Sequence, residues 1–168
     1  MFYPERPRTR PPKTFFDYLF EIMATVAMLY GFFLCVINYS TLPASIPIHF
    51  NASGVADGWG SKEMIWLLPF LTVIMVPGML LLRRWPWISN VPFKITEENA
   101  TYQYGLIVRL LGFLACIVSL LFLTIVYDTI RVANGISPMF LGVWFLPLVV
   151  SPILGSLIWY CMAAFRGR

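Results

Sequence analysis

The sequence is poor in charged residues. Asp, Glu, Lys and Arg make up 12% of its 168 residues, whereas 59% of the residues are hydrophobic. A soluble domain of this length is about a quarter charged and about half apolar. The composition therefore excludes a soluble globular protein and favours an integral membrane protein.

Histidine and cysteine are also scarce. His49 is the one histidine, and the three cysteines, Cys35, Cys116 and Cys161, all fall inside apolar segments. A metal centre needs several good ligands at suitable spacing, and a disulfide framework needs cysteines in loops. We therefore expect no metal, no cofactor and no disulfide, and we predict no catalytic residue.

No polar stretch is long enough to enclose a core of its own, because the longest gap between apolar segments is about twenty residues. Four apolar segments have the length of about 20 residues that crosses a bilayer. They are residues 18–39, 64–82, 105–127 and 140–164. The sequence predicts an all-α membrane protein, with four transmembrane helices in one domain, 18–164, and two short flanking segments, 1–17 and 165–168.

The basic residues are distributed unevenly between the two sides of these spans. Nine precede the first span, follow the second or follow the fourth, and two lie in the other connectors (Lys62 and Arg131). Cytoplasmic segments carry such an excess. We expect both termini and connector 83–104 in the cytoplasm, loop 40–63 outside, and the Pro- and Arg-rich tail near membrane lipids. The net charge of +4 therefore does not indicate a nucleic-acid partner.

The outer loop has an unusual sequence, LPASIPIHFNASGVADGWGSKEM at 42–64. Its prolines stop a helix, its Asn, Asp and Gly residues form turns, and Ser61 has the position of a helix N-cap. In an extended chain, Ile46, Ile48 and Phe50 face one way and His49 faces the other. We predict an ordered loop. Its structural residues are Pro43, Pro47, Phe50, Gly54, Gly58, Gly60 and Ser61.

The polar groups of this loop, with Trp59, are candidates for binding a partner: His49, Asn51, Asp57, Trp59 and Lys62. A dyad of His49 and Asp57 is the catalytic alternative, but its nucleophile would have to be Ser53 or Ser61, which are typical turn and cap residues. We favour the interpretation that His49 and Asp57 bond backbone groups and hold the shape of the loop.

Two charged residues, Glu21 and Arg109, lie inside the predicted spans at similar shallow depth. Intramembrane charges either form pairs or extend toward the interface, so a Glu21–Arg109 pair competes with simple snorkelling of Arg109. The second and fourth spans also share a pattern, WLLP at 66–69 and WFLP at 144–147, each followed by another proline. Membrane helices that are interrupted by prolines in matching positions occur at transport sites, but prolines also produce ordinary helix kinks, and we favour kinks here.

The motif LPxxIPxHFxxxGxxDGWGSK, at residues 42–62, resembles the signature of a bacterial membrane family of unknown function. The same domain forms the amino-terminal part of SdpI-type immunity proteins, and the resemblance covers about residues 24 to 80. It implies a bacterial cytoplasmic-membrane protein with a role in immunity against a peptide toxin, or in signalling by holding a repressor at the membrane.

The expected function is that of a non-enzymatic membrane protein whose outer loop recognises a peptide, lipid or envelope partner. A small carrier or accessory subunit of a transport complex is the first alternative. A membrane enzyme that uses His49 and Asp57 is the second.

Overall fold

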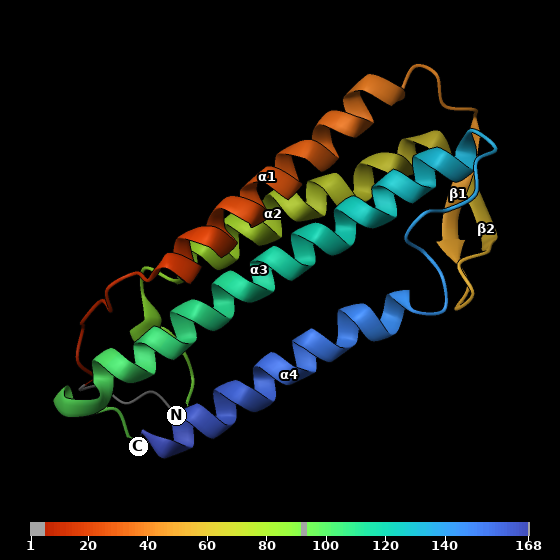
Figure 1. Cartoon of the computed structure of the whole chain (residues 1–168). Coiled ribbons are helices and arrows are strands. Elements are labelled where there is room, and N and C mark those ends of the chain that lie inside the picture. Colours follow the sequence, from red (N-terminus) through yellow and green to blue (C-terminus); the bar gives the residue numbers. More distant parts are fainter. Residues whose placement is uncertain (1–5, 92–93, 168) are drawn as a thin grey trace.

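The computed structural model describes residues 6–91 and 94–167. Residues 1–5 of the predicted tail, 92 and 93 of the predicted connector, and residue 168 of the predicted end lie outside the described residues. The remaining chain is mostly helical (Figure 1).

Among the described residues, four helices are long and apolar enough to cross a membrane. They are α1 (Phe15–Asn38), α2 (Leu67–Leu82) with the preceding 3-10 helix η1 (Lys62–Trp66), α3 (Glu97–Ala133) and α4 (Phe145–Arg166). A second 3-10 helix, η2 (Pro86–Ile88), lies between α2 and α3. The prediction of four helices that are long and apolar enough to cross a membrane is confirmed.

Local capping explains where two of the helices begin. At the start of α1, the backbone N–H and the hydroxyl of Thr14 both donate to Asp17 Oδ2, at 2.8 and 2.7 Å. At the start of α3, the N–H of Thr96 donates to the Asn99 side chain at 2.9 Å. Thr96 is the N-cap of α3. Helix α3 begins at Glu97 and ends at Ala133, so it extends beyond the predicted span 105–127 at both ends.

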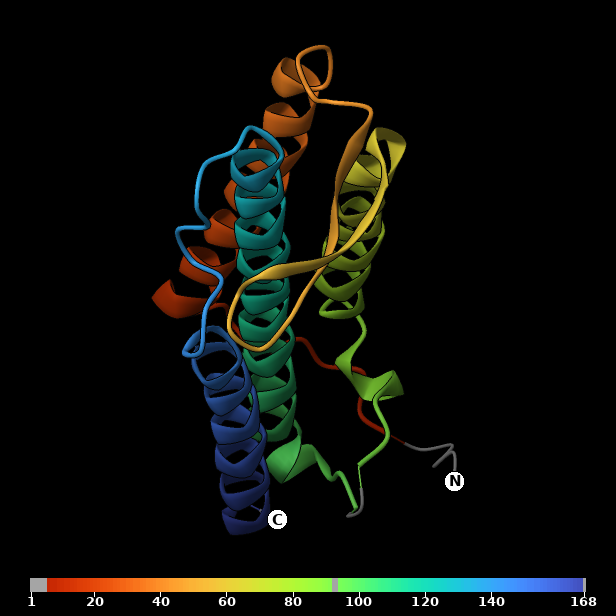
Figure 2. The ribbon, with the colours of Figure 1, turned by 90° about the vertical axis from the view of Figure 1, so that its right-hand side faces the viewer.

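Helices α1, α2 and α3 form a bundle, and α4 lies along α3 on another side (Figures 1 and 2). The three bundled helices meet at Ala24, Val76 and Ala115, all fully buried. Small side chains let helix backbones approach closely in a membrane. The approach of α1 and α3 is close enough for the hydroxyl of Ser119 to donate to the carbonyl of Ala24, at 2.7 Å.

The all-α prediction is wrong in one region, because the loop after α1 forms an antiparallel hairpin. Its strands are β1 (Ser45–Phe50) and β2 (Ala56–Ser61). The hairpin lies along α3, and its tip comes next to the segment that leads into α4 (Figure 2). Ile46 anchors it in an apolar cluster that contains residues of α1, η1 and α3.

The predicted alternation along β1 is only partly correct. Ile46 is 1% exposed and the neighbouring Pro47 is also buried, whereas Ile48 is 49% exposed. The register shifts between Pro47 and His49, so Ile48 has no partner opposite it on β2. A bulge of this kind changes which way the following side chains point. It places Ile48 on the exposed side of the hairpin.

Candidate functional site

The tip of the hairpin is held by Asn51. Its side-chain oxygen accepts hydrogen bonds from the backbone N–H groups of Ser53 at 2.9 Å and Val55 at 3.1 Å. The backbone N–H of Asn51 donates to the carbonyl of Val55. Asn51 was predicted as a binding residue. The structure instead uses its side-chain oxygen to close the turn between the strands, which is the common use of Asn in turns.

Gly54 completes this turn with a left-handed backbone, at a φ of +77°. A Cβ atom at this position would lie 2.2 Å from the carbonyl oxygen of Leu141, in the segment before α4. Both the conformation and the space require glycine. Gly54 therefore packs the hairpin tip directly against the α3–α4 connection.

Asp128, near the end of α3, fixes that connection. The backbone N–H groups of Met139, Phe140 and Leu141 donate to its carboxylate at 2.8, 2.7 and 2.7 Å. Asp128 is fully buried. Sequence reasoning missed this residue, although an acidic group at the end of an apolar segment, followed by a Gly- and Pro-containing stretch, is a usable signal.

A pocket of about 250 Å³ lies between the hairpin and the start of α4. His49 lies beside it, and Asn51 and Gly54 contribute to the wall on the hairpin side. The rest of the wall is mainly apolar: Ile48, Phe50, Ile125, Leu141, Phe145 and Leu146. Pockets of this composition bury the apolar part of a ligand and orient it with a few polar groups.

His49 and Asp57 form a cross-strand pair. Their Nδ1 and Oδ1 atoms are 2.5 Å apart, and the side chains are 69% and 44% exposed. The interpretation that they bond backbone groups is therefore wrong, because they bond each other. Gly58 faces His49 across the hairpin, and a Cβ atom there would lie 2.9 Å from the histidine Cβ. The contact leaves Nε2 of His49 without a partner among the described residues.

Asp57 does not line this pocket, and neither do two other predicted binding residues, Trp59 and Lys62. Trp59 is 54% exposed on β2. The ammonium of Lys62 lies 4.7 Å from the centre of the Tyr39 ring at the end of α1, a cation–π contact that ties the base of the hairpin to that helix. Of the five predicted residues, His49 contacts Asp57 and lines the pocket together with Asn51.

The serines proposed as nucleophiles do not lie opposite His49. Ser61 pairs with Ser45 at the far end of the hairpin, where it is the N-cap of η1. Near it, a Cβ atom on Gly60 would lie 2.9 Å from the side chain of Ile48, so this position also favours glycine. Within 6–91 and 94–167, no group of three or more His, Cys, Asp or Glu side chains is placed to hold a metal ion.

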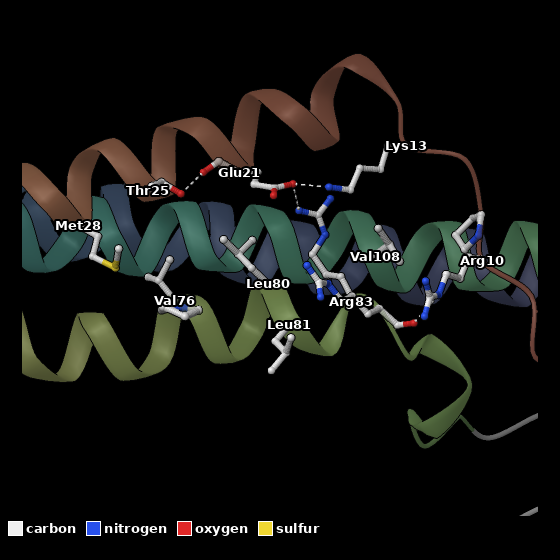
Figure 3. Close-up of a pocket in the computed structure, with 13 residues that line it drawn as sticks. Arg10, Lys13, Glu21, Thr25, Met28, Val76, Leu80, Leu81, Arg83 and Val108 are labelled. Carbon is white, nitrogen blue, oxygen red and sulfur yellow. Dashed lines mark hydrogen bonds and ion pairs between the residues drawn. The ribbon is translucent and has the colours of Figure 1, made fainter.

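At the opposite end of the bundle, the predicted Glu21–Arg109 pair is wrong. Glu21 instead contacts Lys13 at 2.7 Å and Arg83 at 3.4 Å (Figure 3). Arg83 also pairs with Asp17 at 3.3 Å. Arg109 makes no ion pair among the described residues, and its Nε is buried without a hydrogen-bond partner.

The Arg83 side chain reaches these carboxylates because it directly follows the last residue of α2 and because its guanidinium packs against Gly112 of α3. A Cβ atom on Gly112 would lie 3.2 Å from the guanidinium carbon of Arg83, which is tight. The sequence contains two signals for the cluster, the Thr14-x-x-Asp17 capping spacing and an arginine directly after an apolar run. Neither signal indicates that the two residues meet.

The interior of the bundle bears on the carrier alternative. A cavity lined by Ala27, Gly31 and Phe122 has a volume of only about 10 Å³. The two hydroxyls that line it, Thr72 and Ser119, donate to helix carbonyls at 2.7 Å. Pro77 and Pro152 lie inside α2 and α4, which remain continuous helices. At about 10 Å³, this cavity is too small to form a polar passage between α1, α2 and α3.

Comparison with known proteins relates the hairpin region to a family. Residues 26–73 match a family described as Domain of unknown function (DUF1648). An uncharacterized protein of Archaeoglobus fulgidus is 26% identical over 133 residues, which cover 70% of this chain and 73% of that protein. No solved structure matches. The matched region comprises the second half of α1, the whole hairpin and the beginning of α2.

Proposed function

We propose that this chain is a non-enzymatic protein of the cytoplasmic membrane whose hairpin end binds an extracytoplasmic peptide or protein partner. The orientation is supported by nine basic residues that precede α1, follow α2, or lie at the C-terminal end of α4 and after it, since cytoplasmic segments carry such an excess. In this orientation both termini and the α2–α3 connector are cytoplasmic, and the hairpin and the α3–α4 connection are outside.

The observation that carries the proposal is the pocket beside the hairpin. Its two walls are fixed independently, the hairpin tip by Asn51 and the α3–α4 connection by Asp128. A pre-ordered pocket binds more tightly than a loose one, because less conformational entropy is lost on binding. The density of turn and capping residues in the motif is explained by this need for order.

The side chains that line the pocket indicate which kind of ligand it binds. Its apolar wall accommodates a hydrophobic side chain of the partner, and Nε2 of His49 is available for a hydrogen bond to the partner's polar backbone. A peptide supplies both kinds of group. The resemblance of the motif to SdpI-type immunity proteins supports a secreted peptide as the partner, with immunity or signalling as the result of binding.

The test is a selection of random peptides on the purified protein in nanodiscs. Selected peptides should share a large apolar residue, and their affinity should fall about tenfold for His49→Ala and for Leu146→Ala, which corresponds to about 1.4 kcal/mol of lost contact. Leu148→Ala is the matched control, because Leu148 is an exposed leucine of the same helix that does not line the pocket.

The comparison among these variants decides the outcome. If peptides bind the His49 and Leu146 variants as tightly as the native protein, the pocket is not the binding site. If no peptide is selected whose binding depends on these two residues, the proposal fails.

The contact between Nδ1 of His49 and the carboxylate of Asp57 supports a second candidate, a membrane enzyme that acts on the same peptide. A carboxylate bonded to Nδ1 orients an imidazole and stabilises its protonated form, as in catalytic triads. Cleavage of a bound peptide by the native protein, lost in both His49→Ala and Asp57→Asn with the hairpin still folded, would favour the enzyme over the binding protein.

A further inference from the structure

A second and larger pocket, of about 590 Å³, lies at the end of the bundle opposite the hairpin. It is a groove between α1 and α2, with α3 as its floor at Val108 (Figure 3). One part of it is apolar, with Met28, Val76 and Leu80 along the helices. The other part is charged and lies where the chain enters α1 and leaves α2.

The charged part has an excess of positive charge. Four basic residues line it, Arg10, Lys13, Arg83 and Arg84. Two carboxylates form ion pairs with these residues: Glu21 contacts Lys13 and Arg83, and Asp17 contacts Arg83. The positively charged side chains of Arg10 and Arg84 therefore have no carboxylate partner within the cluster.

Some hydrogen-bond donors of the arginines in this cluster also have no acceptor among the described residues. The Arg83 side chain is 3% exposed, yet its Nε has no hydrogen-bond partner among the described residues. Arg84 is exposed, and its side chain makes no hydrogen bond or ion pair with another described residue. A buried donor without a partner costs free energy, and an anion with several oxygen acceptors removes that cost.

We propose that this groove binds an anionic glycerophospholipid, with the phosphate at the arginine cluster and an acyl chain along the apolar wall. The charge of the groove is complementary to a phosphate, which arginine recognises through several donors. The groove also lies at the end of membrane-spanning helices, the depth at which lipid headgroups occur, and basic pockets between such helices hold anionic headgroups. The bound lipid links α1 to α2 where Arg83 already joins them.

The experiment uses the full-length protein in mild detergent, with lipid binding measured by native mass spectrometry. The probes are phosphatidylglycerol and phosphatidylcholine with the same acyl chains. The native protein should bind phosphatidylglycerol in preference. Arg84→Gln should weaken that binding about fivefold, the ratio that corresponds to about 1 kcal/mol per basic residue at a membrane surface.

Arg166→Gln is the matched control, because Arg166 is an exposed arginine at the end of α4 that does not line the groove. It should leave phosphatidylglycerol binding unchanged. Equal weakening by both substitutions would mean diffuse attraction to the basic surface and would overturn the proposal. Equal binding of the two lipids would overturn it as well.

Inorganic phosphate and glycerol 3-phosphate separate a lipid site from a site for free phosphate. For a lipid site, neither compound displaces phosphatidylglycerol at millimolar concentration, since neither contacts the apolar wall. Displacement by either one would assign the arginine cluster to a soluble phosphate compound and would refute the lipid site.

Discussion

Replacing Asp128 by alanine removes the acceptor for three backbone N–H groups of the α3–α4 connection. Hydrogen bonds to a charged group contribute about 1.5–3 kcal/mol each, so three independent bonds would give an upper bound of about 9 kcal/mol. The three share one carboxylate, and two of the donors belong to exposed residues, Met139 and Phe140. Since water replaces part of what is lost, we expect a decrease of about 2–4 kcal/mol in the free energy of unfolding.

Asparagine at the same position should cost less than alanine. Its single oxygen can keep the two bonds made by Oδ2, to Phe140 and Leu141, while its amide nitrogen then faces the N–H of Met139. One bond is lost and two donors oppose each other, so we expect a loss of about 1–2 kcal/mol. The geometry therefore predicts that the free energy of unfolding decreases from the native protein to Asp128→Asn and further to Asp128→Ala.

The assay is unfolding in SDS, combined with hydrogen exchange of the amides of residues 139–141. Exchange should accelerate in both variants, and most in Asp128→Ala. Asn134→Ala is a suitable control, because Asn134 lies near the same helix end and donates one side-chain bond to the carbonyl of Ile130. Unchanged exchange and stability in Asp128→Ala would refute the assignment of Asp128 as the anchor of the pocket wall.

Two further predictions concern the orientation and the hairpin tip. In a background without native cysteines, a cysteine at Ser53 should react with an impermeant thiol reagent in intact cells, and one at Asn90 only after lysis; the reverse pattern would invert the proposed orientation. Gly54→Ala should destabilise the protein by about 1–3 kcal/mol, because alanine strains the left-handed backbone and its Cβ overlaps the carbonyl of Leu141. Gly142→Ala, with open space at its Cβ, should have little effect in the same unfolding assay, and equal effects would contradict this account of Gly54.

Several features of this protein were predictable from the sequence because they depend on local chemistry. Four apolar stretches of bilayer length specify four helices wherever they pack. Thr96 caps α3 through Asn99, three residues away. The prolines and turn residues of the motif exclude a helix between α1 and η1, and Asn51 closes its turn within four residues.

Other features were decided by the tertiary structure, because they join residues that are distant in the sequence. Arg83 rather than Arg109 meets Glu21, at a separation of 62 residues. Depth in the membrane, which the sequence does indicate, says nothing about which helix faces lie together. The hairpin register is likewise set by the burial of Ile46 against α1, η1 and α3. The pocket beside His49 exists because Asp128, far along the chain, holds the connection before α4 against Gly54.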